Sequence, residues 1–310
     1  MRAFLSSGSS LEYFYMITGV ITLFFALLTL RDKEHPQKLG TAVFWGVLGI
    51  IFIGGPKIPP LAAGIMVIFI ALLAGIGKVG KGNYYKTTPE FQKKRREELG
   101  NRLLLPIFAI SGMAIVFALL KLHPLVGFGV GSVVALIMAL IYVPRDNFMN
   151  IMDAGRETSD RIGWALILPP YLAALGKLFA TAGVGEIVAS GFTAVFPMEN
   201  QIWALVAYAL GMAVFTMIMG NAFAAFAVIT AGIGVPIVIN MHGADPATVG
   251  VLAMTAGYCG TLLTPMAANF NIVPAALLDI RDEYKVIKVQ AAMALLLWAT
   301  HIVLMNYMAF

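Results

Sequence analysis

The stretch GTLLTPMAANFN, from Gly260 to Asn271, lies inside an otherwise apolar run over residues 249–278. Pro265 in this stretch has no backbone N–H to donate, and it disfavours helical backbone at the residue before it. Polar side chains gather around this proline: Thr261, Thr264, Asn269 and Asn271. Because non-helical backbone at bilayer depth is tolerated only where it is buried in protein or lines a wet cavity, the stretch predicts a broken membrane helix. Broken helices of this kind hold substrates and ions in secondary transporters.

The composition of the chain as a whole indicates a membrane protein. Of the 310 residues, 60% are hydrophobic and 12% are charged, whereas a soluble domain carries about 25% charged residues. The charges are clustered and leave long uncharged runs, so we expect an all-α polytopic membrane protein in the cell inner membrane. The basic residues lie in loops, where orientation in the bilayer explains them, and the net charge of +5 therefore does not indicate a nucleic-acid partner.

Hydropathy predicts about ten transmembrane helices, since a helix needs about 20 apolar residues to cross the bilayer. We expect one transmembrane domain over residues 1–310, with N-terminal helices over 1–143 and a transport core over 144–310. The expected spans are 11–30, 39–53, 61–76, 103–120, 124–143, 162–180, 184–196, 202–219, the broken 249–278, and 287–310.

Basic loops predict the orientation. Residues 78–102 hold eight Lys and Arg residues, so this loop should be cytoplasmic, and counting spans from it places both termini outside. The loops 31–38 and 144–161 then also lie inside. The apolar segment 221–240 contains two glycines and a proline and could be a span or a re-entrant hairpin. A hairpin keeps the basic cluster at 281–288 inside, so we expect a re-entrant hairpin there.

Two segments are candidates for a binding site. Unwinding near Pro265 would free carbonyls for a small cation, and the half-helix that follows would point its N-terminus at an anion. Gly220 and Asn221 form a natural hairpin tip, because both residues tolerate turn conformations. The alternatives are a proline-kinked helix whose polar groups bond to neighbouring helices, and a small-residue packing face. The expected substrate-binding residues are Gly220, Asn221, Thr261, Thr264, Asn269 and Asn271, and the expected cation-binding residues are Thr255, Gly260, Thr261 and Asn269.

Other chemistry has less support in the sequence. The charged segment 153–161 alternates in sign and is typical of a solvated helix with local ion pairs, with a gate or partner contact as the alternative. There is no metal-ligand spacing and no Walker A, HExxH, GxSxG or CxxC motif. We therefore expect neither an enzyme nor a cofactor, and no metal beyond an alkali cation.

Two runs of sequence carry a family resemblance. FTMIMGNAFAAFAVITAGIGVP (215–236) and GYCGTLLTPMAANFNIVPAALLDI (257–280) resemble a bacterial membrane family, formerly of unknown function, that is described as one subunit of a two-subunit 5-oxoproline (pyroglutamate) transporter. More distantly, the chain is similar to the ion-transporter superfamily of gluconate, citrate and dicarboxylate carriers. That resemblance implies a hairpin tip at Gly220 and Asn221 and an unwound loop from Thr261 to Asn269. It also implies a second hairpin over 162–191, or a second half-site supplied by a partner subunit.

The sequence thus supports a secondary active transporter subunit that moves a small carboxylate by cation-coupled alternating access. Its expected partners are a small organic anion, a second membrane subunit and the lipid bilayer, with Na⁺ or H⁺ as the coupling ion. The alternative is a membrane scaffold or assembly subunit whose broken helix is a packing device. An intramembrane enzyme would need a His, a Cys or paired carboxylates at mid-depth, and the sequence offers none with a clear placement.

Overall fold

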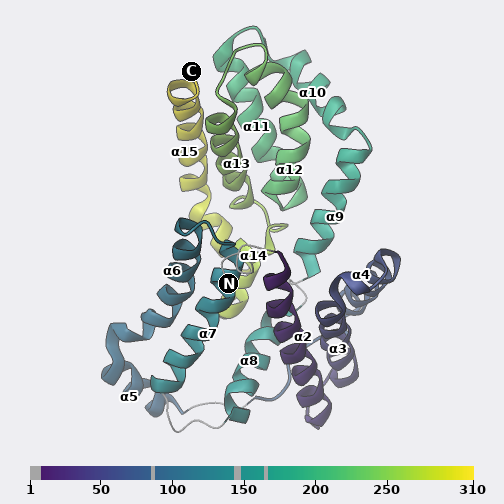
Figure 1. Cartoon of the computed structure of the whole chain (residues 1–310), viewed down its shortest axis with the longest axis vertical. Coiled ribbons are helices and arrows are strands. Elements are labelled where there is room, and N and C mark those ends of the chain that lie inside the picture. The colour runs from purple at the N-terminus through teal and green to yellow at the C-terminus, as the bar shows by residue number, and fades with distance from the viewer. Residues whose placement is uncertain (1–7, 85–87, 143–147, 164–166) are drawn as a thin grey trace. The chain divides into compact units, whose positions relative to one another are not determined.

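The computed structural model describes residues 8–84, 88–142, 148–163 and 167–310, and the regular secondary structure of that part of the chain is helical (Figure 1). The chain divides into two compact units, Met1–Arg161 (unit 1) and Ile162–Phe310 (unit 2). This division falls after Arg161, whereas the sequence places the start of the expected transport core at residue 144.

Seven helical segments are long and apolar enough to cross a membrane, within the described residues: Ser10–Arg31, Lys38–Lys57, Pro89–Leu119, Pro124–Tyr142, Gln201–Met219, Ala222–Ile239 and Lys285–Met308. The expected count of about ten spans is not confirmed. The apolar segments near 61–76 and 184–196 form helices of 16 and 12 residues, which are shorter than a bilayer crossing requires. Residue 143 and residues 164–166, which fall in two of the expected spans, lie outside the described residues.

Unit 1 is built from two helix pairs and two polar helices. α2 packs against α3, and α6 packs against α7. In the first pair Phe25, Phe44 and Trp45 form a buried aromatic group, in which the Phe44 and Trp45 rings meet edge to face at 5.1 Å. The elements of unit 1 are α2 (Gly8–Arg31), α3 (Lys38–Gly54), η1 (Gly55–Lys57), α4 (Pro60–Gly75), α5 (Pro89–Leu99), η2 (Gly100–Leu104), α6 (Leu105–Leu119), α7 (Pro124–Tyr142) and α8 (Phe148–Ile162).

Unit 2 is built around α11 (Gln201–Met219), which packs against α12, α13 and α15. Leu205, Tyr208 and Met212 of α11 are fully buried, and the Tyr208 hydroxyl lies 2.7 Å from the Thr230 hydroxyl. Because its neighbours enclose it, α11 anchors the segments that form the site described below. The other elements of unit 2 are α9 (Leu168–Thr181), α10 (Val184–Val195), α12 (Ala222–Ile229), η4 (Thr230–Ile239), α13 (Pro246–Thr261), α14 (Ala268–Leu277) and α15 (Lys285–Met308).

The re-entrant hairpin expected within 221–240 is not confirmed. α12 passes directly into η4, a π-helical segment, and Thr230 at the junction keeps helical backbone angles. The two glycines and Pro236 are therefore accommodated by the wider π-helical turn and do not reverse the chain. Together α12 and η4 make 18 residues of continuous helix, which is long enough to cross a membrane.

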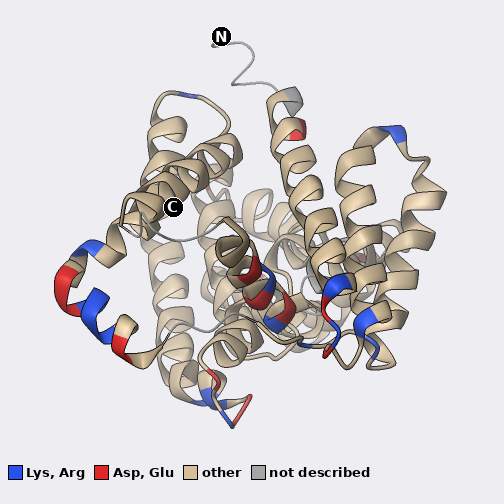
Figure 2. Cartoon of the chain, turned by 90° about the horizontal axis from the view of Figure 1, so that it is seen from below, with Lys and Arg blue, Asp and Glu red and all other residues tan. Residues whose placement is uncertain are grey.

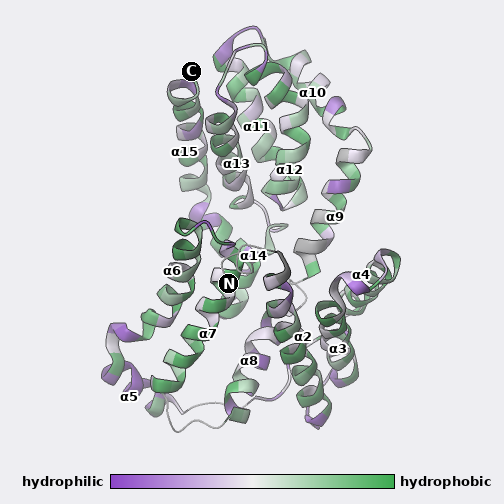
Figure 3. Ribbon diagram, in the orientation of Figure 1, coloured by the Kyte–Doolittle hydropathy of each residue, from purple (hydrophilic) through white to green (hydrophobic). Residues whose placement is uncertain are grey.

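Charged residues gather in short stretches of the chain, and most of the helical ribbon carries none (Figure 2). α5, with the sequence PEFQKKRREEL, is hydrophilic along its length, whereas α6 and α7 are strongly hydrophobic (Figure 3). Several long apolar helices separated by short charged stretches indicate a membrane protein.

Candidate anion site in unit 2

The predicted break in the 249–278 run is present. α13 ends at Thr261, α14 begins at Ala268, and the six residues between them are not helical. Pro265 lies in this segment, as its missing backbone donor leads one to expect. The break makes two half-helices from one apolar run.

Side chains of α14 and α15 satisfy backbone carbonyls that the break frees. Asn271, which is 0% exposed, donates through Nδ2 to the carbonyl oxygens of Thr261 at 2.8 Å and Thr264 at 2.5 Å. Its Oδ1 accepts a hydrogen bond from Nε2 of Gln290 in α15, at 2.5 Å. Gln290 Nε2 also donates to the Leu262 carbonyl at 3.1 Å. Buried carbonyls must be paired, so these two side chains stabilise the unwound segment.

A second turn, between α11 and α12, faces the break. Gly220 has φ +66°, a left-handed conformation that favours glycine, and a Cβ atom there would lie 2.5 Å from the Met266 carbonyl oxygen. Asn221 is the N-cap of α12, and its Oδ1 accepts from the backbone N–H groups of Phe223 at 2.9 Å and Ala224 at 3.4 Å. The turn and the unwound segment are therefore in close contact.

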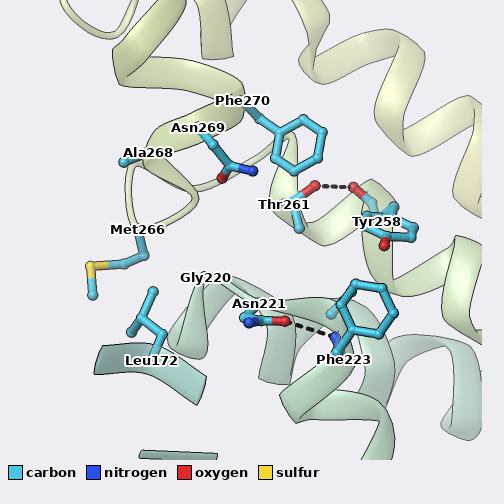
Figure 4. A pocket seen from close by; sticks show the side chains of 11 residues that line it. Leu172, Gly220, Asn221, Phe223, Tyr258, Thr261, Met266, Ala268, Asn269 and Phe270 are labelled. Atoms are coloured by element: carbon cyan, nitrogen blue, oxygen red, sulfur yellow. Dashed lines mark hydrogen bonds between the residues drawn. The ribbon is translucent and has the colours of Figure 1, made fainter. Parts of the chain in front are cut away.

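A cavity of about 240 Å³ lies between the turn and the break. Figure 4 shows Asn221 on one wall and Asn269 on the opposite wall, with Thr261 and Tyr258 to one side and Met266 to the other. Three aromatic rings line it together: Phe223 and Tyr258 meet edge to face at 6.0 Å, and Tyr258 lies 6.2 Å from Phe270. The full lining is Leu172, Gly220, Asn221, Ala222, Phe223, Tyr258, Thr261, Met266, Ala268, Asn269 and Phe270.

The electrostatics of the cavity favour an anion. No lining residue carries a formal charge. The first residues of two helices, Ala222 of α12 and Ala268 of α14, both line it. Backbone N–H groups in the first turn of a helix have no partner within the helix, and the helix dipole adds a partial positive charge there. At α12 the Asn221 side chain already accepts from two of these groups, whereas α14 has no side-chain cap. The arrangement is chemically suited to a small anion.

Residues 12–310 match the family described as "Protein of unknown function (DUF979)". The chain belongs to the DUF979 family. No curated protein and no solved structure matches it significantly. The resemblance of the DUF979 chain to a 5-oxoproline transporter subunit therefore stays a proposal.

The cavity brings together four of the expected substrate-binding residues, Gly220, Asn221, Thr261 and Asn269. The Thr261 hydroxyl already donates to the Tyr258 carbonyl at 2.6 Å. The Asn269 side chain is exposed and has no hydrogen-bond partner within the described part of the chain, so its carboxamide is available to a ligand.

The other two expected substrate-binding residues do not line the cavity. The Thr264 hydroxyl, from a buried side chain, donates to the Met217 carbonyl at 2.8 Å and accepts from the backbone N–H of Met266 at 3.2 Å. It attaches the unwound segment to the end of α11. Asn271 holds the break together in the way described above. Their spacing along the sequence does not show that Thr264 and Asn271 hold the fold together whereas Asn269 lines the cavity.

The four expected cation-binding residues do not all line the cavity. Thr255 lies outside the cavity and donates to the carbonyls of Val251 and Leu252, both at 3.0 Å. Gly260 is a close-packing position, because a Cβ atom there would lie 2.3 Å from the Ala213 carbonyl oxygen. Thr261 and Asn269 do line the cavity. The described residues contain no group of three or more His, Cys, Asp or Glu side chains that could hold a metal ion.

Sequence reasoning missed Gln290 and the aromatic wall. Gln290 is a polar residue inside the apolar C-terminal helix, and that placement was the available signal. Phe223 and Phe270 carried no signal, because an isolated aromatic residue in an apolar helix is as expected on a lipid-facing surface as in a binding site.

Proposed function

We propose that this chain is a subunit of a secondary active transporter that binds a small carboxylate in the unit 2 cavity. The observation that carries this proposal is the meeting of two helix N-termini, those of α12 and α14, at one neutral cavity. A carboxylate there is stabilised by backbone N–H groups and needs no buried Lys or Arg. A broken helix such as α13–α14, with a half-helix N-terminus at the site, is an arrangement by which transporters bind substrate.

The size and lining of the cavity restrict the substrate. Drug-sized ligands occupy pockets of about 300–1,000 Å³, so 240 Å³ fits a smaller molecule. The rings of Phe223, Tyr258 and Phe270 suit a compact, partly apolar body, and the Asn269 carboxamide can pair with a neutral amide. A molecule such as 5-oxoproline, a five-membered lactam with one carboxylate, has the compact, partly apolar body, the neutral amide and the carboxylate that this cavity would bind.

The coupling ion and the second subunit belong to the same proposal. Na⁺ and H⁺ remain the two candidate coupling ions, because the cavity presents Thr and Asn oxygens but no acidic side chain. We place the protein in the cell inner membrane with the basic loop 78–102 on the cytoplasmic side. A second membrane subunit would supply the other half-site that related two-hairpin carriers contain.

One observation favours the scaffold alternative. The polar groups of Thr264, Asn271 and Gln290 are committed to hydrogen bonds within the chain, as a packing device would require. The scaffold alternative does not account for Asn269, whose carboxamide faces the cavity with no partner among the described residues.

Titration of the purified protein with a carboxylate distinguishes a transporter subunit from a scaffold. We expect heat release on titration with 5-oxoproline and none with 2-pyrrolidinone, which has the same ring and no carboxylate. Uptake of labelled 5-oxoproline by vesicles that contain this chain and its partner subunit, with Na⁺ and pH varied separately, then identifies the coupling ion. Absence of carboxylate binding under all these conditions would leave the scaffold as the better explanation.

A further inference from the structure

A second group of buried polar side chains lies in unit 1 and includes no residue of the anion site. It forms where three segments meet: the connection between α2 and α3, the residues 78–84, which we call the 78–84 strap, and α8. Arg156 and Asp160 of α8 are 3% and 5% exposed. The sequence predicted a solvated helix for this segment, and that prediction is wrong for these two residues.

Hydrogen bonds attach the 78–84 strap to α3, to the α2–α3 connection and to α8. The backbone N–H of Gly80 donates to the Thr41 hydroxyl at 3.0 Å, and that of Asn83 donates to Asp32 Oδ2 at 3.0 Å. The strap ends at Tyr84, whose hydroxyl donates to Asp160 Oδ2 at 2.9 Å. Side chains from the strap and from α8 therefore meet in a fixed geometry.

The charge of Arg156 is matched by two carboxylates other than Asp160. Its guanidinium pairs with Asp32 at 3.2 Å and with Asp153 at 2.9 Å, and Nη2 donates to the Asn83 carbonyl at 2.8 Å. The same guanidinium lies 4.9 Å from the centre of the Tyr84 ring.

Asp160 has neutral donors in place of an ion pair. Oδ1 accepts from the indole Nε1 of Trp45 at 2.5 Å, and Oδ2 accepts from the Tyr84 hydroxyl. Among the residues that the structure describes, no Lys, Arg or His forms a salt bridge with it. When Asp160 is ionised, the cluster holds three carboxylates against one guanidinium. Uptake of one proton on Asp160 lowers that excess of negative charge from two to one and removes the cost of burying an unpaired ion.

Burial and the Asp153 carboxylate favour the protonated form of Asp160, whereas Trp45, Tyr84 and Arg156 favour the ionised form. Burial raises the pKa of Asp160 to about 6, although the hydrogen bonds from Trp45 and Tyr84 oppose this rise. Burial also lowers the pKa of His35, which favours its neutral form, and raises the pKa of Tyr84. The titratable and charged groups that act on Asp160 are Tyr84 from the strap and Asp153 and Arg156 from α8, and Asp32 of the α2–α3 connection reaches the cluster through its ion pair with Arg156.

We propose that Asp160 is a proton-binding site, which takes up one proton on Oδ2 from the water that reaches the partly exposed Tyr84. The Tyr84 hydroxyl donates to the ionised carboxylate and can rotate to accept from the protonated one, so both states keep the hydrogen bond. No other bond forms or breaks, and the proton comes from solvent and returns to it. The proposal concerns unit 1 alone and does not depend on the anion site.

Infrared spectroscopy of the full-length protein in lipid nanodiscs tests this directly, because a protonated carboxyl group has a C=O stretching band that histidine and tyrosine lack. We expect a band that appears as the pH falls through about 6, well above the range of ordinary carboxylates. Asp160→Asn should abolish this band while keeping the contacts with Trp45 and Tyr84, since a carboxamide offers one acceptor and one donor. Asp245→Asn, which removes an exposed helix-capping carboxylate in unit 2, should leave it unchanged.

A second variant keeps the test decisive if Asp160→Asn does not fold. Tyr84→Phe removes a donor that stabilises the ionised form, so the midpoint of the band should rise by about one pH unit. A wild-type protein with no carboxyl band between about pH 5 and 7 would overturn the proposal. So would a band that persists in Asp160→Asn, or a midpoint unchanged in Tyr84→Phe.

Discussion

Asn269 and Asn271 lie two positions apart on α14, and we expect replacement of each by leucine to have opposite consequences. Leucine is close to asparagine in size and removes the carboxamide, so the pair is a matched comparison. Asn271→Leu should destabilise the protein, and Asn269→Leu should weaken anion binding without destabilising it.

The magnitude for Asn271 follows from its contacts. Its carboxamide makes three hydrogen bonds, at 2.8 Å to the Thr261 carbonyl and at 2.5 Å to the Thr264 carbonyl and to Gln290 Nε2. A hydrogen bond contributes about 1 kcal/mol, so the loss should be about 3 kcal/mol. Carbonyls left buried without a partner would add to this cost.

The magnitude for Asn269 concerns the ligand. Its side chain is exposed and has no hydrogen-bond partner in the described part of the chain, so Asn269→Leu should change stability by less than about 0.5 kcal/mol. A lost hydrogen bond to the neutral amide of the ligand costs about 0.5–1.5 kcal/mol, which is roughly a two- to tenfold loss of affinity.

Thermal unfolding of the detergent-solubilised protein and calorimetric titration with 5-oxoproline measure the two effects on the same samples. Two results would refute the reasoning: an Asn271→Leu protein as stable as the wild type, or an Asn269→Leu protein that binds the carboxylate with unchanged affinity. The first would mean that Asn271 does not hold the break together, and the second that the cavity is not the anion site.

Three further outcomes are expected. Gly220→Ala should weaken carboxylate binding in the same titration. A residue with a side chain pays about 1–2 kcal/mol for the left-handed backbone, and the new Cβ atom would displace the turn from Met266. Unchanged affinity would show that this contact does not shape the cavity. Thr264→Val should lower the free energy of unfolding by about 1 kcal/mol through loss of the bond to the Met217 carbonyl, measurable by thermal unfolding, and no change would contradict the attachment described here. The pKa of Asp160 is raised from 3.8 to about 6 in the folded state, so its stabilising contribution is complete below pH 3.8 and is lost as the pH rises through 6. This change amounts to about 3 kcal/mol in the free energy of unfolding. Asp160→Asn should remove it from the pH profile of unfolding, and identical profiles for the variant and the wild type would contradict the assignment.

The sequence by itself determined the class of protein and the position of the break. Clustered charge and long apolar runs are properties of the chain alone, and they indicate helices in a membrane because no other backbone structure except a closed barrel satisfies its hydrogen bonds there. Pro265 lacks a backbone donor and so favours an interruption of the helix, and Gly220 allows a turn because it lacks a Cβ atom. The interruption between Thr261 and Ala268 and the turn after Met219 could therefore be predicted locally.

The tertiary structure decided which polar residues serve the cavity and which serve the fold. Asn269 and Asn271 are chemically identical and nearly adjacent, but the helical rotation between them directs one toward the cavity and the other toward Gln290 on α15. Tertiary packing also decides the environment of Asp160, which accepts hydrogen bonds from Trp45 and Tyr84, 115 and 76 residues away in sequence. Partners this distant are brought together by packing, and packing decides whether a polar group meets water, a ligand or another side chain.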